Sequence, residues 1–125
     1  MKNLFLLSMF LLFKQLNTTA QISKSFDGVW VGQGYQINNN GTWSIKLTIK
    51  GENIKIEYPS LGCEAVLTKI SSESKKLYLS EKISNNGNCV DNGRVELEWL
   101  TPNEIRYKWS FSDGEVGSFS TLIKF

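Results

Sequence analysis

The fold is decided by residues 43–58, which read WSIKLTIKGENIKIEY. Apolar side chains alternate with polar ones in both halves of this stretch, and turn residues 51–53 separate the halves. Alternation with a period of two is typical of a strand that has one face buried and the other in water. The stretch therefore predicts two antiparallel strands joined by a tight turn.

The same alternation continues on both sides of this hairpin, and residues that favour turns interrupt it at short intervals. Asn-Gly at positions 40–41 and Pro59 are two of these interruptions. Helical periodicity is absent outside the N-terminal segment. The sequence thus predicts eight strands, at residues 26–36, 43–50, 54–58, 63–70, 76–83, 94–99, 105–111 and 117–125.

Eight short strands in series predict an all-β fold, an antiparallel up-and-down barrel of the lipocalin or avidin kind. Closing the last strand on the first removes both exposed edges. A two-sheet β-sandwich would use the same alternation and stays as the alternative. The alternation predicts an inward-facing set: Trp30, Trp43, Ile45, Leu47, Ile49, Ile54, Ile56, Leu77, Leu79, Val95, Leu97, Trp99, Tyr107 and Trp109.

Residues 1–20 have the pattern of an export signal. Lys2 precedes an apolar run, and the segment ends in the small residues Thr18, Thr19 and Ala20. About ten apolar residues are too few to span a bilayer, which takes about 20, although an uncleaved anchor stays as an alternative. We therefore predict a signal peptide at 1–20, a single barrel domain at 21–125, and a periplasmic or extracellular location.

The charge of the predicted mature chain and its lack of His make several classes of function less favoured. Lys2 and Lys14 lie in the signal, so 12 of the 14 basic residues remain against 12 acidic ones, and the chain has no His. A neutral chain without His disfavours nucleic-acid binding, His-ligated metals and His-based catalysis. We predict no enzyme, no cofactor and no metal. The polar run 72–75 is expected to be a solvated turn, and Glu96 and Glu98 are expected to face water.

Cys63 and Cys89 are the two cysteines of the chain. An oxidising compartment would let a disulfide between them persist, and free thiols are the alternative. Both lie at the same end of the predicted sheet. A bridge would require the loops 59–62 and 86–92 to lean together, which makes that rim a clamped surface.

Aromatic residues give the clearest indication of a binding site, because they combine a flat apolar wall with a hydrogen-bonding tip. They would also serve simply as the core. Asp91 lies on the clamped rim, where it would accept hydrogen bonds from loop amides or from a ligand. The candidate ligand-binding residues are Trp30, Tyr35, Trp43, Tyr58, Asp91, Tyr107 and Trp109.

Two resemblances accompany this interpretation. The residues Gly28-Val29-Trp30 resemble the G-x-W opening of lipocalins and avidin-type barrels, which hold small ligands. Gly32 stands where avidins place a ligand-contacting Asn, so biotin binding is not implied. The blocks 58–63 (YPSLGC), 89–93 (CVDNG) and 107–109 (YKW) resemble an exported bacterial domain of uncharacterised role. That resemblance implies a Cys63–Cys89 bridge and a binding or sensing role outside the cytoplasm.

We therefore expect a secreted or periplasmic binding module for a small apolar or amphipathic ligand held in a barrel cavity. The first alternative is a protein–protein adaptor or inhibitor that acts through the clamped rim. A small outer-membrane barrel is a further alternative, because residues 119–125 alternate up to the last residue. Expected partners are a small molecule or an extracytoplasmic protein, without nucleic acid and without stable membrane insertion.

Overall fold

The computed structural model describes residues 25–85 and 87–125. The predicted signal peptide at 1–20 lies outside the described residues. The described chain forms eight strands and one short 3₁₀ turn in the order β1 (Gly28–Gln36), β2 (Thr42–Lys50), β3 (Asn53–Tyr58), η1 (Pro59–Leu61), β4 (Cys63–Ser72), β5 (Lys76–Asn85), β6 (Arg94–Thr101), β7 (Glu104–Ser110) and β8 (Val116–Lys124).

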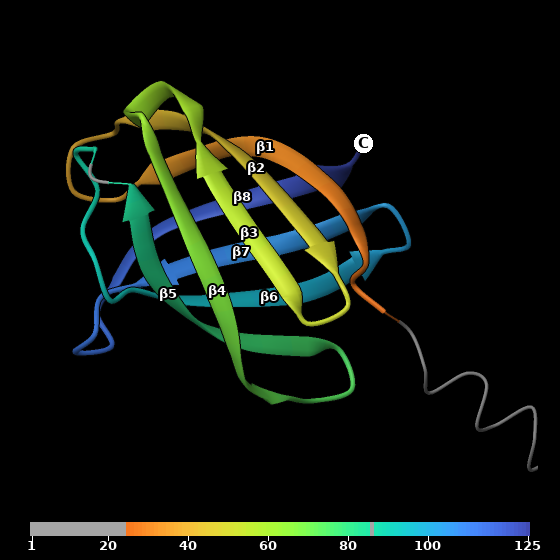
Figure 1. Ribbon diagram of the computed structural model, residues 1–125. Coiled ribbons are helices and arrows are strands. Elements are labelled where there is room, and N and C mark those ends of the chain that lie inside the picture. Colours follow the sequence, from red (N-terminus) through yellow and green to blue (C-terminus); the bar gives the residue numbers. More distant parts are fainter. Residues whose placement is uncertain (1–24, 86) are drawn as a thin grey trace, which may run out of the picture.

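These strands close into an antiparallel up-and-down barrel, which confirms the predicted fold class (Figure 1). Each strand pairs with its neighbour in sequence, and β8 pairs with β1 through partners such as Val31↔Ile123 and Tyr35↔Phe119. Closure of the ring pairs both edge strands, which a two-sheet sandwich would leave open. Register shifts interrupt the ladder at four places, one of them between Trp109 and Ser110.

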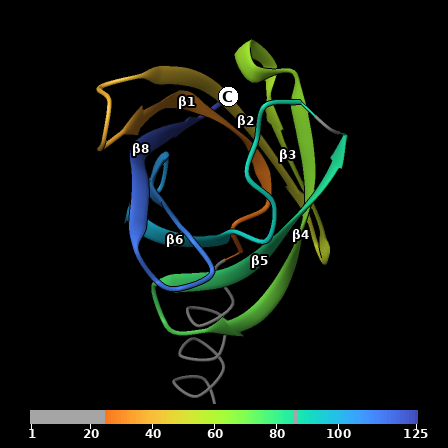
Figure 2. The ribbon, with the colours of Figure 1, turned by 90° about the vertical axis from the view of Figure 1, so that its left-hand side faces the viewer.

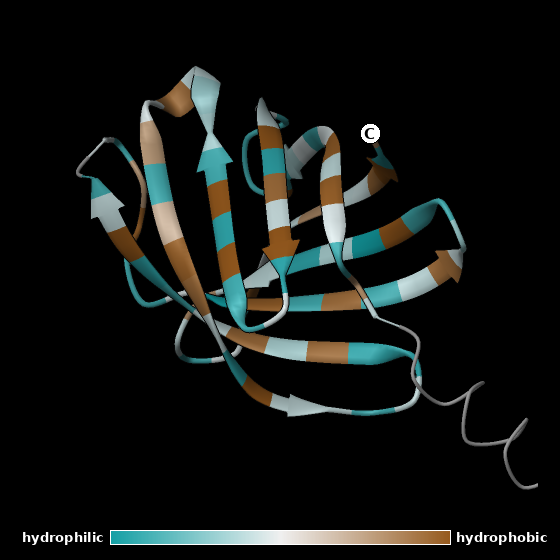
Figure 3. Ribbon diagram, turned by 45° about the vertical axis from the view of Figure 1, so that its right-hand side comes forward, coloured by the Kyte–Doolittle hydropathy of each residue, from teal (hydrophilic) through white to brown (hydrophobic). Residues whose placement is uncertain are grey.

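The barrel interior is the hydrophobic core. Apolar and polar residues alternate as bands along the strands (Figure 3), and the residues of the predicted inward-facing set are either buried or packed against the buried cluster. The alternation therefore gave the correct face for every member of that set. Further buried residues that the set did not include are Tyr58, Cys63, Ala65, Leu67, Glu81, Ile105, Ser118, Ser120 and Leu122.

One end of the barrel is filled by aromatic side chains. Trp30 is fully buried there, and its indole N–H donates to the Phe26 carbonyl oxygen at 2.8 Å. The Trp99 ring stacks on Phe26 and meets Trp30 edge-on, with ring centroids 4.7 and 5.6 Å apart. We call Phe26, Trp30 and Trp99 the aromatic plug. The G-x-W opening thus closes this end.

The other end of the barrel carries longer connections. In an up-and-down barrel, alternate connections lie at the same end, so the β1–β2, β3–β4, β5–β6 and β7–β8 connections gather opposite the aromatic plug. Figure 2 looks onto this end, with the β5–β6 and β7–β8 connections in front of the strands. We call it the rim.

Candidate functional site

A cavity of about 240 Å³ opens at the rim. A cavity of about 150 Å³ can bind benzene, so this one has room for one aromatic ring with a short side chain. Its apolar lining residues include Trp43, Leu61, Val90 and Phe111, and its polar lining residues include Gln36, Asn88, Glu81 and Glu115.

The polar floor of this cavity is a hydrogen-bonded cluster around Glu81, which is only 3% exposed. Tyr58 donates its phenol O–H to Glu81 Oε2 at 2.5 Å, and Trp109 donates its indole N–H to Glu81 Oε1 at 3.0 Å. The phenol oxygens of Tyr58 and Tyr107 lie 2.8 Å apart. The single phenol proton of Tyr58 is donated to Glu81, so Tyr58 can only accept from Tyr107. The phenol O–H of Tyr107 is therefore the donor in this second hydrogen bond. We call these four residues the carboxylate cluster.

Burial controls the acidity of the cluster. Loss of water raises the pKa of Glu81 above 4.5, while the donors Tyr58 and Trp109 favour the ionised carboxylate and oppose that rise. Burial also raises the pKa of Tyr58 and Tyr107 well above 10. Both phenols therefore stay protonated at physiological pH. Glu81 is the member of the cluster whose charge changes most readily.

Two glycines leave room for the Trp109 indole. A Cβ on Gly93 would collide with Trp109 Nε1, and a Cβ on Gly117 would lie 2.8 Å from Trp109 Cε3. Gly93 also accepts the backbone N–H of Glu81 through its carbonyl oxygen, at 2.9 Å. The close approach of these backbones fixes the indole beside the carboxylate, and the strand irregularity after Trp109 lies next to it.

One buried hydroxyl in the cavity lining has no partner. Ser118 is fully buried, and its Oγ makes no hydrogen bond to any of the described residues. Buried polar groups are nearly always hydrogen-bonded, and leaving one unpaired costs about 1–3 kcal/mol.

The structure brings four of the seven predicted site residues together. Trp43, Tyr58, Tyr107 and Trp109 all line the rim cavity. Trp30 lies in the aromatic plug at the other end. The remaining two, Tyr35 and Asp91, are outside the cavity lining. Tyr35 faces outward from β1, is 46% exposed, and donates its phenol O–H to Asn40 Oδ1.

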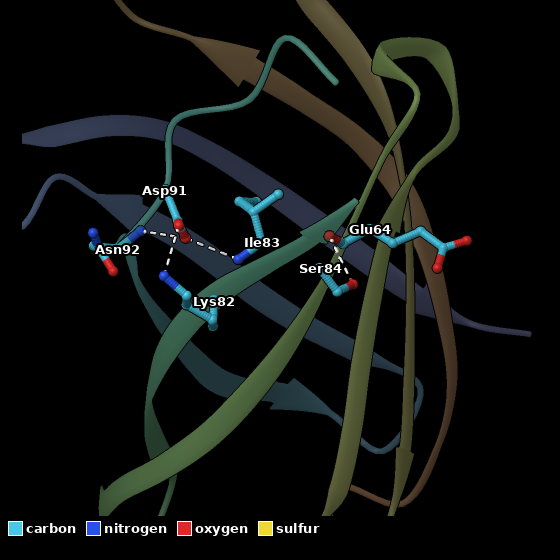
Figure 4. A network of polar contacts seen from close by, with 6 residues as sticks. All are labelled: Glu64, Lys82, Ile83, Ser84, Asp91 and Asn92. Carbon is cyan, nitrogen blue, oxygen red and sulfur yellow. Dashed lines mark hydrogen bonds and ion pairs between the residues drawn. The ribbon is translucent and has the colours of Figure 1, made fainter. Parts of the chain in front are cut away.

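Asp91 anchors the β5–β6 connection to β5 (Figure 4). Its Oδ1 accepts the backbone N–H groups of Ile83 and Asn92, each at 2.8 Å, and its Oδ2 pairs with Lys82 Nζ at 2.9 Å. The backbone hydrogen bond from Ile83 contributes most to a pKa of about 2 for Asp91, below its ordinary 3.8. Loop and strand amides, rather than the cavity, use the acceptors of this carboxylate.

The lowered pKa of Asp91 predicts a loss of stability in acid. A group whose pKa is depressed by folding stabilises the native state above pH 3.8, and that contribution is lost as the pH falls from about 3.8 to about 2. Glu81 acts in a separate window, because its raised pKa lowers stability as the pH rises above 4.5.

We expect Asp91→Asn to flatten the dependence of unfolding free energy on pH between 4 and 2, as measured by urea denaturation at several pH values. Glu52→Gln, which removes one carboxylate from the exposed β2–β3 turn, is the control and should retain the slope. An unchanged slope in Asp91→Asn would contradict the role of these hydrogen bonds.

A disulfide joins Cys63, at the start of β4, to Cys89 in the β5–β6 connection, with Cα atoms 6.3 Å apart. The prediction of a bridge between these two residues is therefore confirmed. Cys89 and Val90 both line the cavity. The bridge thus ties one wall of the cavity to the barrel.

Glu81 is the functional candidate that the sequence analysis missed. It follows Leu77 and Leu79 at a spacing of two on one strand, so the alternation itself placed it inside the barrel. A carboxylate at a position that the pattern assigns to the core is unusual, since buried charges occur almost solely with partners. A glutamate at a core position of the alternating pattern was therefore the feature of the sequence that could have identified Glu81 as a candidate site residue.

Glu96 and Glu98, unlike Glu81, lie on the outer face of the barrel, as the sequence predicted. They face outward and pair across strands, Glu96 with Lys108 at 3.4 Å and Glu98 with Arg106 at 3.1 Å.

Within residues 25–85 and 87–125, no group of three or more Cys, Asp or Glu side chains is arranged to hold a metal ion. No helix in the same part of the chain is long and apolar enough to cross a membrane.

Comparison of the chain with protein families, curated proteins and solved structures finds no match.

Proposed function

We propose that this protein is an exported, non-enzymatic binding module that takes one small amphipathic ligand into the rim cavity. The observation that carries the proposal is the cavity itself, an aromatic-walled space with a buried carboxylate in its lining. Ligand sites in proteins typically combine an apolar wall with a few polar groups that fix orientation.

Export is supported by the disulfide, because such bridges persist mainly in oxidising compartments. A role without catalysis is supported by the chain's lack of His and by the geometry of Glu81. The oxygens of that carboxylate already accept hydrogen bonds from two neighbours, which suits a fixed binding group better than a group that exchanges protons.

A soluble module accounts for the barrel interior better than an outer-membrane barrel does. Spanning strands need about 9–11 residues and usually enclose a polar interior. The β3 strand has six residues, and the interior holds the apolar core.

Tryptophan fluorescence of the full chain tests the proposal, since Trp43 and Trp109 line the cavity. We expect saturable quenching by at least one member of a panel of single-ring amines, alcohols and carboxylates. Ser118→Leu, which fills the cavity from β8, should abolish the quenching. Thr121→Leu, on the same strand but exposed, is the matched control and should retain it. The absence of quenching across the panel would refute the proposal.

An adaptor or inhibitor role is the second candidate, favoured by exposed apolar side chains at the rim. Ile37 is 47% exposed and Val90 is 56% exposed, and both border the cavity mouth. A rim that binds a protein should be insensitive to Ser118→Leu but should lose its partner with Ile37→Asp/Val90→Asp. Co-purification from an extracytoplasmic extract, compared between these variants, separates the two functions.

A further inference from the structure

We infer that the ligand of the rim cavity is a small organic cation, an ammonium group carried on an apolar body of about one ring. The inference rests on the proposed function and names the chemical class of its ligand. The first observation is the charge of the lining. Of the described residues that line the cavity, Glu81 and Glu115 are the charged ones, and none is Lys or Arg.

The second observation is the hydrogen-bond inventory of the carboxylate cluster. Each donor in the cluster has a single proton, and each proton is already used: Trp109 and Tyr58 donate to Glu81, and Tyr107 donates to Tyr58. A carboxylate has about four lone-pair sites, of which two are taken here. The floor therefore offers a ligand mainly acceptors, so the ligand must bring donors, as an ammonium group does.

The third observation is the aromatic wall. Trp43, Tyr58, Tyr107, Trp109 and Phe111 all contribute to the lining, and Trp109 and Phe111 meet edge-on with centroids 4.7 Å apart. Aromatic faces carry partial negative charge and attract cations. The same faces, together with Glu81, would repel the carboxylate of an anionic ligand.

The charge on Glu81 makes such binding dependent on pH. The groups that face Glu81 are Tyr58 from β3, Tyr107 from β7 and, through its charge, Asp91 from the β5–β6 connection. Asp91 is paired with Lys82, and its pKa of about 2 keeps it ionised at pH 4. Neither phenol ionises below pH 10. Protonation of the buried Glu81 between pH 7.5 and pH 4 would therefore weaken cation binding, whereas Glu115, the other carboxylate residue of the lining, is exposed to water.

The test is isothermal titration of the full chain with three probes that share a phenyl ring and a two-carbon linker: phenethylamine, 2-phenylethanol and 3-phenylpropionate. We expect phenethylamine to bind at least tenfold more tightly than the other two at pH 7.5. Its affinity should fall at least fivefold at pH 4, while that of 2-phenylethanol should stay constant.

Glu81→Gln keeps the shape of the side chain and removes its charge, so it should erase the preference for the amine. Glu98→Gln, on the outer face beside Arg106, is the matched control and should leave the preference intact. Because wild-type selectivity and its pH dependence are measured independently, the test does not depend on the folding of the Gln variant.

The possible outcomes separate the two claims. Equal or tighter binding of the alcohol or the carboxylate would overturn the cationic assignment and leave the binding function standing. Preference for the amine that survives Glu81→Gln would overturn the role of Glu81 as the partner of the cation, because the selectivity would then come from other groups of the lining. Failure of all three probes to bind, together with no quenching in the fluorescence panel, would overturn the binding function itself.

Discussion

Replacing both cysteines with alanine is expected to lower the free energy of unfolding by about 3.5 kcal/mol. The bridge closes a loop with a sequence separation of 26, and the loss of loop-closure entropy in the unfolded chain gives this figure. A single domain of this size has a total stability of about 5–15 kcal/mol, so the Cys63→Ala/Cys89→Ala variant should be markedly weakened. Urea denaturation followed by tryptophan fluorescence measures the change.

The same variant should also weaken ligand binding, because Cys89 and Val90 form part of the cavity wall. Reduction of the wild-type bridge with dithiothreitol is the control, and it should reproduce both effects without any substitution. A shift in the urea midpoint that corresponds to less than about 1 kcal/mol would contradict the prediction. It would mean that the unfolded chain already keeps these loops together.

Trp30→Ala is expected to cost about 3–5 kcal/mol of stability. The side chain is fully buried, and removing it would leave a cavity in the aromatic plug and an unpaired carbonyl at Phe26. The plug also holds Trp99 and lies beneath the ammonium group of Lys124, 5.6 Å from the Trp30 ring. Chemical denaturation in urea gives the loss directly.

Variants at Trp30 also test whether this residue stabilises the fold without taking part in ligand binding. Because it lies at the end of the barrel away from the rim cavity, the folded Trp30→Ala protein should bind phenethylamine within about twofold of wild type. Trp30→Phe is the milder control, which retains a ring and loses the hydrogen bond to Phe26, a change of about 1 kcal/mol for that bond. A large loss of affinity in either folded variant would place Trp30 in the ligand site.

The eight strands could be predicted from the sequence because apolar and polar side chains alternate along them. In a strand, that alternation shows directly which residues face the core and which face water. In residues 43–50 every second side chain is apolar, and the structure buries or half-buries that face. Strand ends were displaced by one or two residues, as at Ser72 and Asn85, because pairing with a neighbour extends a strand beyond its alternating part.

The candidate site could be predicted only in part. Trp43, Tyr58, Tyr107 and Trp109 were chosen as aromatic residues on inward or end positions, and they do line one cavity. Trp30 has the same chemistry and the same inward face, yet it lies at the other end of the barrel. The direction of a strand and its register with its neighbours decide at which end of the barrel a residue lies. The type of residue carries no information about strand direction or register.

The alternation of side chains and the short turns by themselves determined an all-β barrel with an apolar interior and eight strands that are antiparallel neighbours in chain order. Only the tertiary structure decided that Glu81, Tyr58, Tyr107 and Trp109 meet, since they come from three strands, and Tyr58 and Trp109 are 51 positions apart in the chain. Alternation is a local property, set by the geometry of one strand. A cluster drawn from several strands depends on register and on the close backbone approach at Gly93 and Gly117, which only the closed barrel fixes.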